Sequence, residues 1–315
     1  MTKRFYLTTL LLISVMLLGC DQSNQEPSSI LPSFVQQQSA SLVITQGPLQ
    51  MEILPNFAGR VSAFKLADHN VLVPIRDLNK PQHWGSVLWS SPQSEWVWPP
   101  IDVLDNHPYA LSVSENSVVL TSDLDPNSGY QFSKSYSLSG QHGIAITYRI
   151  FNRSTKHKRV GALEVTRLPA EGDVFFPHGE TDPTSGIFYP LDVKQMDGLS
   201  WYHYDEAKIR NDHHKLMEDG KEGWVAYSNK GYLLVKEFTD NPPDVIVDGE
   251  REVEIFAHVN HTFIEMKQQS AAADLAPGEH LEWTVIWRLV KLPPDLAQNA
   301  EPRLMADFVR ELLQQ

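Results

Sequence analysis

Four tryptophans lie close together in one stretch of the chain, at Trp84, Trp89, Trp96 and Trp98. Aromatic rings stack on the apolar C–H faces of sugars, so a cluster of this kind suits a carbohydrate groove. Tryptophans at alternate positions, such as Trp96 and Trp98, also commonly pack into a core. The cluster therefore predicts either a groove or an aromatic core.

Glu265 is the carboxylate best placed for acid–base chemistry. In a strand, Phe263, Glu265 and Lys267 share one face, opposite Ile264. A glutamate on such a face could accept a hydroxyl proton if a second group donates one on the other side of the substrate. A structural carboxylate, paired with Lys267 or Lys236, is the alternative.

Two carboxylates flanking one bond would instead indicate a lyase or hydrolase. The partner for Glu265 would then be a carboxylate such as Glu164 or Glu180, about 5–10 Å away across a groove. The sequence contains no Gly-rich phosphate loop and no G-x-S-x-G elbow, which argues against nucleotide-dependent and serine-hydrolase chemistry.

The closest histidine pairs do not have the spacing of metal ligands. His213 and His214 are adjacent, and His258 and His261 have opposite strand parity unless a turn intervenes. We therefore expect neither a metal nor another cofactor.

The elements that must position these residues are mainly strands. Apolar residues alternate with period two in residues 130–138, 144–150 and 253–259, which is typical of half-buried strands. Further strands are predicted at Leu42–Thr45, Gln50–Leu54, Val61–Leu66, Val118–Ser122, Gly231–Phe238 and Trp283–Lys291. One C-terminal helix is predicted from helical spacing at Leu304, Met305, Phe308, Val309, Leu312 and Leu313, after Pro302. The fold class is therefore all-β, a large antiparallel β-sandwich with a short C-terminal helix.

The first residues have the order of an export signal. Lys3 and Arg4 precede a short apolar run, and Leu17-Leu18-Gly19-Cys20 resembles the bacterial lipobox, whose cysteine is acylated. We expect a signal peptide over residues 1–19, a lipidated Ser-, Gln- and Pro-rich tether over 20–40, and one folded domain over 41–315.

The composition supports an envelope lipoprotein. Cys20 is the only cysteine, so no intrachain disulfide can form. Asp21 resembles an inner-membrane retention signal, which favours the inner membrane, with the domain facing the periplasm. A net charge of −13 argues against nucleic acid as a partner.

Several motifs resemble, in their order along the chain, those of galactose-mutarotase-like (aldose 1-epimerase-like) domains. The chain resembles an uncharacterised bacterial lipoprotein branch of that superfamily. The opening stretch Leu49–Leu72 contains Pro55-Asn56-Phe57-Ala58-Gly59-Arg60-Val61, and His83–Gln93 runs into Glu95-Trp96-Val97-Trp98-Pro99-Pro100. Gly161–Leu168, Phe263-Ile264-Glu265, Leu275–Glu279 and Trp283–Leu289 continue the match. The resemblance implies two large sheets in a "supersandwich" whose concave face binds sugar.

The resemblance also implies roles for individual residues. Glu265 occupies the position of the catalytic base, whereas the stretch that should supply a histidine has Arg167, which cannot recover a proton near neutral pH. His178 is the candidate replacement. The expected sugar contacts are Arg60, Trp89, Trp96, Trp98, Arg167, His258 and Lys236. A non-catalytic binding or scaffold lipoprotein that reuses the fold remains the alternative.

Overall fold

The computed structural model describes residues 31–96 and 98–315. The predicted signal peptide, Cys20 and Asp21 lie outside the described residues. Within the described part of the chain, no helix is long and apolar enough to cross a bilayer.

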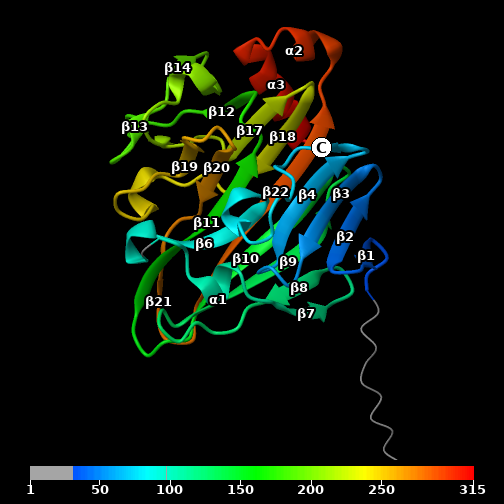
Figure 1. The fold of residues 1–315 in the computed structure, drawn as a ribbon, viewed down its shortest axis with the longest axis vertical. Coiled ribbons are helices and arrows are strands. Elements are labelled where there is room, and N and C mark those ends of the chain that lie inside the picture. Colours follow the sequence, from blue (N-terminus) through cyan, green and yellow to red (C-terminus); the bar gives the residue numbers. More distant parts are fainter. Residues whose placement is uncertain (1–30, 97) are drawn as a thin grey trace, which may run out of the picture. The chain divides into compact units, whose positions relative to one another are not determined.

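Two large sheets make up the described domain (Figure 1). The first sheet contains β1 (Val35–Gln38), β2 (Ser41–Gln46), β3 (Leu49–Leu54), β4 (Arg60–Leu66), β5 (His69–Asn70), β6 (Ser86–Ser91), β11 (Lys158–Leu168), β13 (Tyr189–Pro190), β16 (His214–Glu218), β19 (Val253–Ala257), β20 (Ile264–Gln269) and β21 (Ala273–Leu275). The second contains β7 (Ala110–Val113), β8 (Val118–Thr121), β9 (Tyr130–Ser139), β10 (Gly143–Asn152), β12 (Asp173–Pro177), β14 (Val193–Met196), β15 (Leu199–His203), β17 (Trp224–Asn229), β18 (Tyr232–Glu237) and β22 (His280–Lys291).

The strand pairing is antiparallel in every named pair except β13 with β16. Strands β4, β6, β11, β20, β19 and β16 follow one another across the first sheet, although they come from distant parts of the chain. The predicted all-β sandwich is confirmed. The strand β1, within the stretch expected to be a tether, pairs with β2.

The helices are short. They are α1 (Asp102–Asp105), α2 (Pro294–Gln298) and α3 (Pro302–Leu313), with 3₁₀ turns η1 (Pro81–His83), η2 (Gln93–Glu95), η3 (Glu206–Lys208) and η4 (Pro243–Val245). The predicted C-terminal helix is α3, and it packs beside β17, β18 and β22 (Figure 1). Met305, Val309 and Leu312 face that sheet, whereas Leu304 is largely exposed.

The main core lies between the two sheets. Alternate side chains from both sheets meet there, as the period-two pattern requires. Phe64 of β4 and Trp287 of β22, for example, pack edge to face with ring centroids 5.3 Å apart. This packing fixes which face of each strand points inward and which points outward.

A buried ion pair interrupts this apolar core. Lys236 of β18 and Glu164 of β11 pair between the sheets, both fully buried. Tyr148 Oη and Trp287 Nε1 also donate to Glu164, at 2.5 and 3.1 Å. Burial lowers the pKa of Lys236 to about 8, although Glu164 opposes the shift.

The opposite face of the first sheet is covered by loops instead of a second sheet. On β20, Ile264 and Met266 enter the main core, so Glu265 and Lys267 point to this outer face. The segments that cover it include η1 and η2, which precede and follow β6 in the chain, and the loop that carries Phe188. The candidate site lies beneath these loops.

Candidate functional site

The outer face of the first sheet has a cavity of about 410 Å³. Its volume falls within the range of about 300–1,000 Å³ that is typical of small-molecule sites. The cavity is lined by Gln82, His83, Trp89, Gln93, Trp98, Phe188, His213, Lys215, Phe256, His258, Phe263, Glu265 and Lys267. Strand β6 and the three adjacent strands β20, β19 and β16, which lie beyond β11 in the sheet, contribute these side chains together with the loops beside them.

A row of alternating charges forms the cavity floor. Arg167 of β11 lies directly opposite Glu265 of β20, and its Nε donates to Glu265 Oε1 at 2.9 Å. Lys267 Nζ contacts Glu265 Oε2 at 2.9 Å and Glu254 Oε1 at 2.5 Å. Lys215 Nζ of β16 lies 3.0 Å from the same Glu254 oxygen. The row therefore runs across four neighbouring strands in the order β11, β20, β19 and β16.

These contacts set the ionisation of the floor. Burial alone would raise the pKa of Glu265, but the charges of Lys267 and Arg167 outweigh it and hold that pKa below its ordinary value. The pKa of Glu254 is also low, because Lys267 and Lys215 outweigh its burial. Burial and the charge of Lys267 lower the pKa of Lys215, against the effect of Glu254. Glu265 is thus a stable carboxylate and a weak base.

Trp89 is the centre of the aromatic side of the site. Trp96 and Trp98 pack edge-on against it, with ring centroids 5.4 and 5.9 Å away. Arg167 lies over its ring, with Cζ 5.1 Å from the centroid. Trp89 is consequently almost completely buried, whereas Trp98 is 59% exposed. Trp98 is therefore the tryptophan that offers an open face to a ligand.

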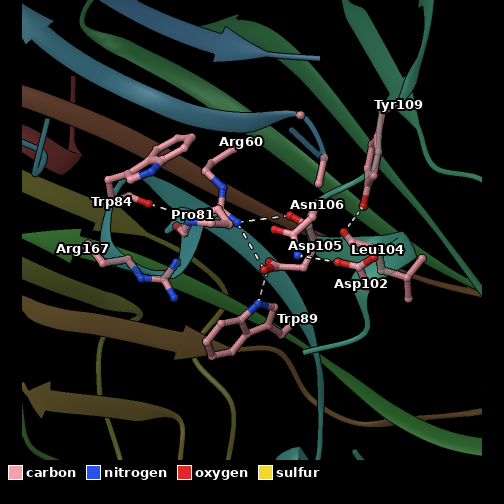
Figure 2. Close-up of polar contacts among 12 residues, drawn as sticks. Arg60, Pro81, Trp84, Trp89, Asp102, Leu104, Asp105, Asn106, Tyr109 and Arg167 are labelled. Carbon is pink, nitrogen blue, oxygen red and sulfur yellow. Dashed lines mark hydrogen bonds and ion pairs between the residues drawn. The ribbon is translucent and has the colours of Figure 1, made fainter. Parts of the chain in front are cut away.

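A second arginine is linked to Trp89 through Asp105 (Figure 2). Asp105 of α1 lies between Arg60 and Trp89: Trp89 Nε1 donates to Asp105 Oδ1 at 2.9 Å, and Arg60 Nη2 to Oδ2 at 3.2 Å. Arg60 Nη1 also donates to the carbonyls of Pro81 and Trp84, at 2.6 and 3.3 Å. Fully buried, Arg60 thus fixes both ends of the segment that carries His83 into the cavity.

Three histidines gather over the floor. The ring of His258 lies 5.6 Å from that of His83 and 4.8 Å from that of His213. The backbone N–H of Asn260 donates to His258 Nδ1 at 3.2 Å, which leaves Nε2 to carry the ring proton. Burial, followed by the neighbouring His213 and His83, lowers the pKa of His258 to about 4. His258 is therefore neutral at pH 7.

The structure brings four of the predicted site residues to the cavity: Glu265, Trp89, Trp98 and His258. Arg167 lies in the floor row, and Arg60 and Trp96 support the site without lining it. Trp96 and Trp98 follow η2 and do not belong to a strand. Both pack against Trp89 because of the loop that carries them, and not because of strand parity.

Two predicted residues lie elsewhere. Lys236 occupies the main core, because strand parity on β18 turns its side chain towards the first sheet's inner face. His178 follows β12, and its backbone forms an isolated antiparallel β-bridge with Gly220. Its Nδ1 lies 3.3 Å from the carbonyl oxygen of Gly179, and the residue does not line the cavity. Glu164 points away from Glu265, into the main core, so those two carboxylates do not flank one groove.

Sequence reasoning missed the cavity residues His83, Lys215, Phe188 and Phe256, and Glu254 in the floor row. Glu254 and Phe256 lie on a strand that was predicted, on the face opposite its apolar pattern, so parity could have identified them. Phe188 comes from a loop, and no periodicity marks it. Among the described residues, no three His, Cys, Asp or Glu side chains form a group that could hold a metal ion.

Comparison with solved structures defines the class of the fold. A galactose mutarotase-like protein from Lactobacillus casei is 10% identical, with a TM-score of 0.56, over 79% of this chain and 100% of that one. A galactose mutarotase-like protein from Clostridium acetobutylicum is 12% identical, with a TM-score of 0.53, over 80% and 95%. A TPR-domain containing protein from Parabacteroides distasonis is 13% identical, with a TM-score of 0.59, over 81% of this chain and 48% of that one. The chain has the galactose mutarotase-like fold.

The sequence places the chain more narrowly. The model of the family described as "Domain of unknown function (DUF4380)" matches residues 40–290, and the chain belongs to that family. No curated protein matches it. The resemblance to galactose-mutarotase-like domains that the motifs indicated is confirmed at the level of the fold.

Proposed function

We propose that this chain binds a carbohydrate in the cavity on the outer face of its first sheet. One observation carries the proposal: open aromatic faces and charged hydrogen-bonding groups converge on one cavity of suitable size. Trp98, Phe256 and Phe263 offer apolar surfaces, while Glu265 accepts and Lys215 donates hydrogen bonds. The galactose mutarotase-like fold supports the same ligand class.

The state of Glu265 favours binding over epimerisation. Its two carboxylate oxygens are already held by Arg167 and Lys267, and both contacts stabilise the ionised form. A general base works best with a pKa near the operating pH, and these cations move the pKa of Glu265 in the opposite direction. We assign Glu265 the role of a fixed hydrogen-bond acceptor for a sugar hydroxyl.

Space beside the cavity allows a ligand longer than one sugar. A neighbouring cavity of about 400 Å³ shares Gln82 and Trp98 with the first. Trp98 therefore has ligand-accessible space on more than one side, as expected of an aromatic residue between two sugar positions. The proposal accordingly includes oligosaccharides.

Calorimetry with a panel of mono- and oligosaccharides tests this proposal. We expect at least one sugar to bind, and Trp98→Ala to weaken it by about tenfold or more, since tryptophans that become buried against a ligand are among the largest contributors to binding energy. Leu111→Ala removes another exposed apolar side chain, on β7 of the second sheet, and should leave binding unchanged. A panel with no binder, or equal affinity for Trp98→Ala and the unsubstituted protein, would contradict the proposal.

The role of Glu265 has a separate readout. Anomer interconversion of a bound sugar, followed by NMR, should proceed no faster than in buffer, because the carboxylate is too weak a base. Catalysed interconversion that disappears in Glu265→Gln would show that the chain is an epimerase and that this assignment is wrong.

We also propose that the chain is a lipid-anchored envelope protein facing the periplasm, on the inner membrane. The support comes from the sequence alone: the charged start, the apolar run, Cys20 and Asp21. Membrane fractionation and palmitate labelling of the full chain and of Cys20→Ser test it. We expect the substitution to abolish labelling and release the protein from the membrane fraction; unchanged labelling and partitioning would contradict the anchor.

A further inference from the structure

The floor of the cavity carries more positive than negative charge. Three cations, Arg167, Lys267 and Lys215, face two carboxylates, Glu265 and Glu254. This is the reverse of the whole chain, whose net charge is −13. Burial lowers the pKa of His83 and His258, so neither of these pocket histidines adds positive charge near neutral pH.

Two of these cations have unused hydrogen-bond donors. Arg167 is fully buried, and its Nη1 and Nη2 have no hydrogen-bond partner among the described residues. Lys215 lines the cavity and contacts one carboxylate oxygen, of Glu254, although an ammonium group carries three donors. Lys267, by contrast, is shared between both carboxylates. Of these two cations only Lys215 lines the cavity, so its unused donors are the ones that an acceptor on a ligand could meet.

We propose that the carbohydrate bound here is an acidic sugar, whose carboxylate lies against Lys215. The inference rests on the proposed carbohydrate function and specifies its ligand class. A single carboxylate neutralises the single excess positive charge of the floor, and a charge-assisted hydrogen bond to an ammonium group is about twice as strong as a neutral one. A hydroxyl of the same ring can meet Glu265, and the ring face can meet Trp98 or Phe256.

The geometry favours Lys215 as the anion contact over its neighbours. Arg167 stacks on the Trp89 ring, pairs with Glu265 and does not line the cavity, so it contributes charge without contacting a ligand in the cavity. Lys215 sits at the end of the floor row on β16, beneath the ring of Phe188, with its Nζ 4.8 Å from the ring centroid. A carboxylate at this end of the cavity would therefore be enclosed between Lys215 and the loop that carries Phe188.

Matched ligand pairs test the charge alone. The probes are oligogalacturonate, oligomannuronate and hyaluronan fragments, each beside its methyl ester, which keeps the ring and linkage but removes the charge. Calorimetry on the full chain should show at least one acid binding about tenfold or more tighter than its ester, the factor equivalent to ~1.4 kcal/mol. In Lys215→Gln the acid and the ester should bind with similar affinity.

Lys230→Gln is the matched control, because Lys230 is an exposed lysine paired with Glu171, away from the cavity. It should keep the full preference for the acid. Melting curves establish that both variants are folded. Equal binding of acid and ester, or a preference that survives Lys215→Gln, would overturn the inference. If neutral sugars bind and acids do so no better, carbohydrate binding stands and only this inference fails; if no sugar of either kind binds, both fail.

Discussion

Replacing Glu265 by glutamine would test whether the charged floor is held together as described. Glu265 and Arg167 are a cross-strand pair, 5% and 0% exposed as whole residues. The substitution leaves three cations with one carboxylate, and it removes the carboxylate that pairs with Arg167. Removing one partner of a buried ion pair typically costs about 3–5 kcal/mol. We expect a loss near the lower limit, roughly 3 kcal/mol, because the glutamine oxygen can still accept one hydrogen bond from Arg167.

The chain contains a matched control pair on its surface. Arg149 and Glu282 are also direct cross-strand partners, on β10 and β22, and they also pair through the arginine Nε, at 2.7 Å. Their side chains are 30% and 50% exposed, so water compensates for the loss of either partner. Glu282→Gln should therefore lower the free energy of unfolding by less than about 1 kcal/mol.

Urea denaturation of the two variants measures the difference. With a slope of about 2–3 kcal/mol per molar urea, Glu265→Gln should unfold at a midpoint lower by roughly 1 M, and Glu282→Gln at nearly the original midpoint. Adding Arg167→Met to Glu265→Gln should recover part of the loss, since it removes the unpaired charge. Equal midpoints for Glu265→Gln and Glu282→Gln, or a further loss in the double variant, would refute this account of the floor.

Two further predictions concern stability. Burial raises the pKa of Glu252 from 4.5 to about 8. Between those two pH values the folded state keeps the proton and the unfolded state loses it. The free energy of unfolding therefore falls as the pH rises, by at most ~1.4 kcal/mol per pH unit. Glu252→Gln should flatten urea midpoints measured from pH 5 to 8; an unchanged slope would contradict this. Gly85→Ala should cost more than about 2 kcal/mol in thermal unfolding, because φ is +70° and the new Cβ would lie 2.5 Å from the carbonyl of Val61. Gly198→Ala, also at positive φ but with no atom within 4 Å, should cost about 1 kcal/mol, and equal losses would show that the contact is unimportant.

Part of the site was predictable from parity alone. Glu265 and Lys267 share a strand face opposite Ile264, and the structure confirms that this face carries the charged floor. Parity could not say which cations would surround Glu265. Arg167 becomes its partner because β11 and β20 are neighbours in register, a pairing between residues 98 positions apart in the chain.

Loops account for what sequence reasoning could not place. His178 follows a strand and His83 precedes one, and of these two histidines His83 lines the cavity. It does so because Arg60 binds the carbonyl oxygens of Pro81 and Trp84, on either side of His83. Trp98 is exposed and Trp89 buried although both belong to one tryptophan cluster, and the difference arises from packing against Arg167 and Trp96. Local sequence does not encode such packing.

The sequence by itself determined the class of this protein: period-two alternation requires strands with one buried face, and helical spacing after Pro302 requires the C-terminal helix. The tertiary structure decided where the chemistry lies. Alternation predicts which side chains share a strand face with Glu164 and with Glu265. Only the order of strands across the two sheets puts Glu164 beside Lys236 in the core and Glu265 beside Arg167 at the cavity. Two glutamate–cation pairs thus acquire different roles, because burial and neighbours are properties of the assembled sheets and not of any one strand.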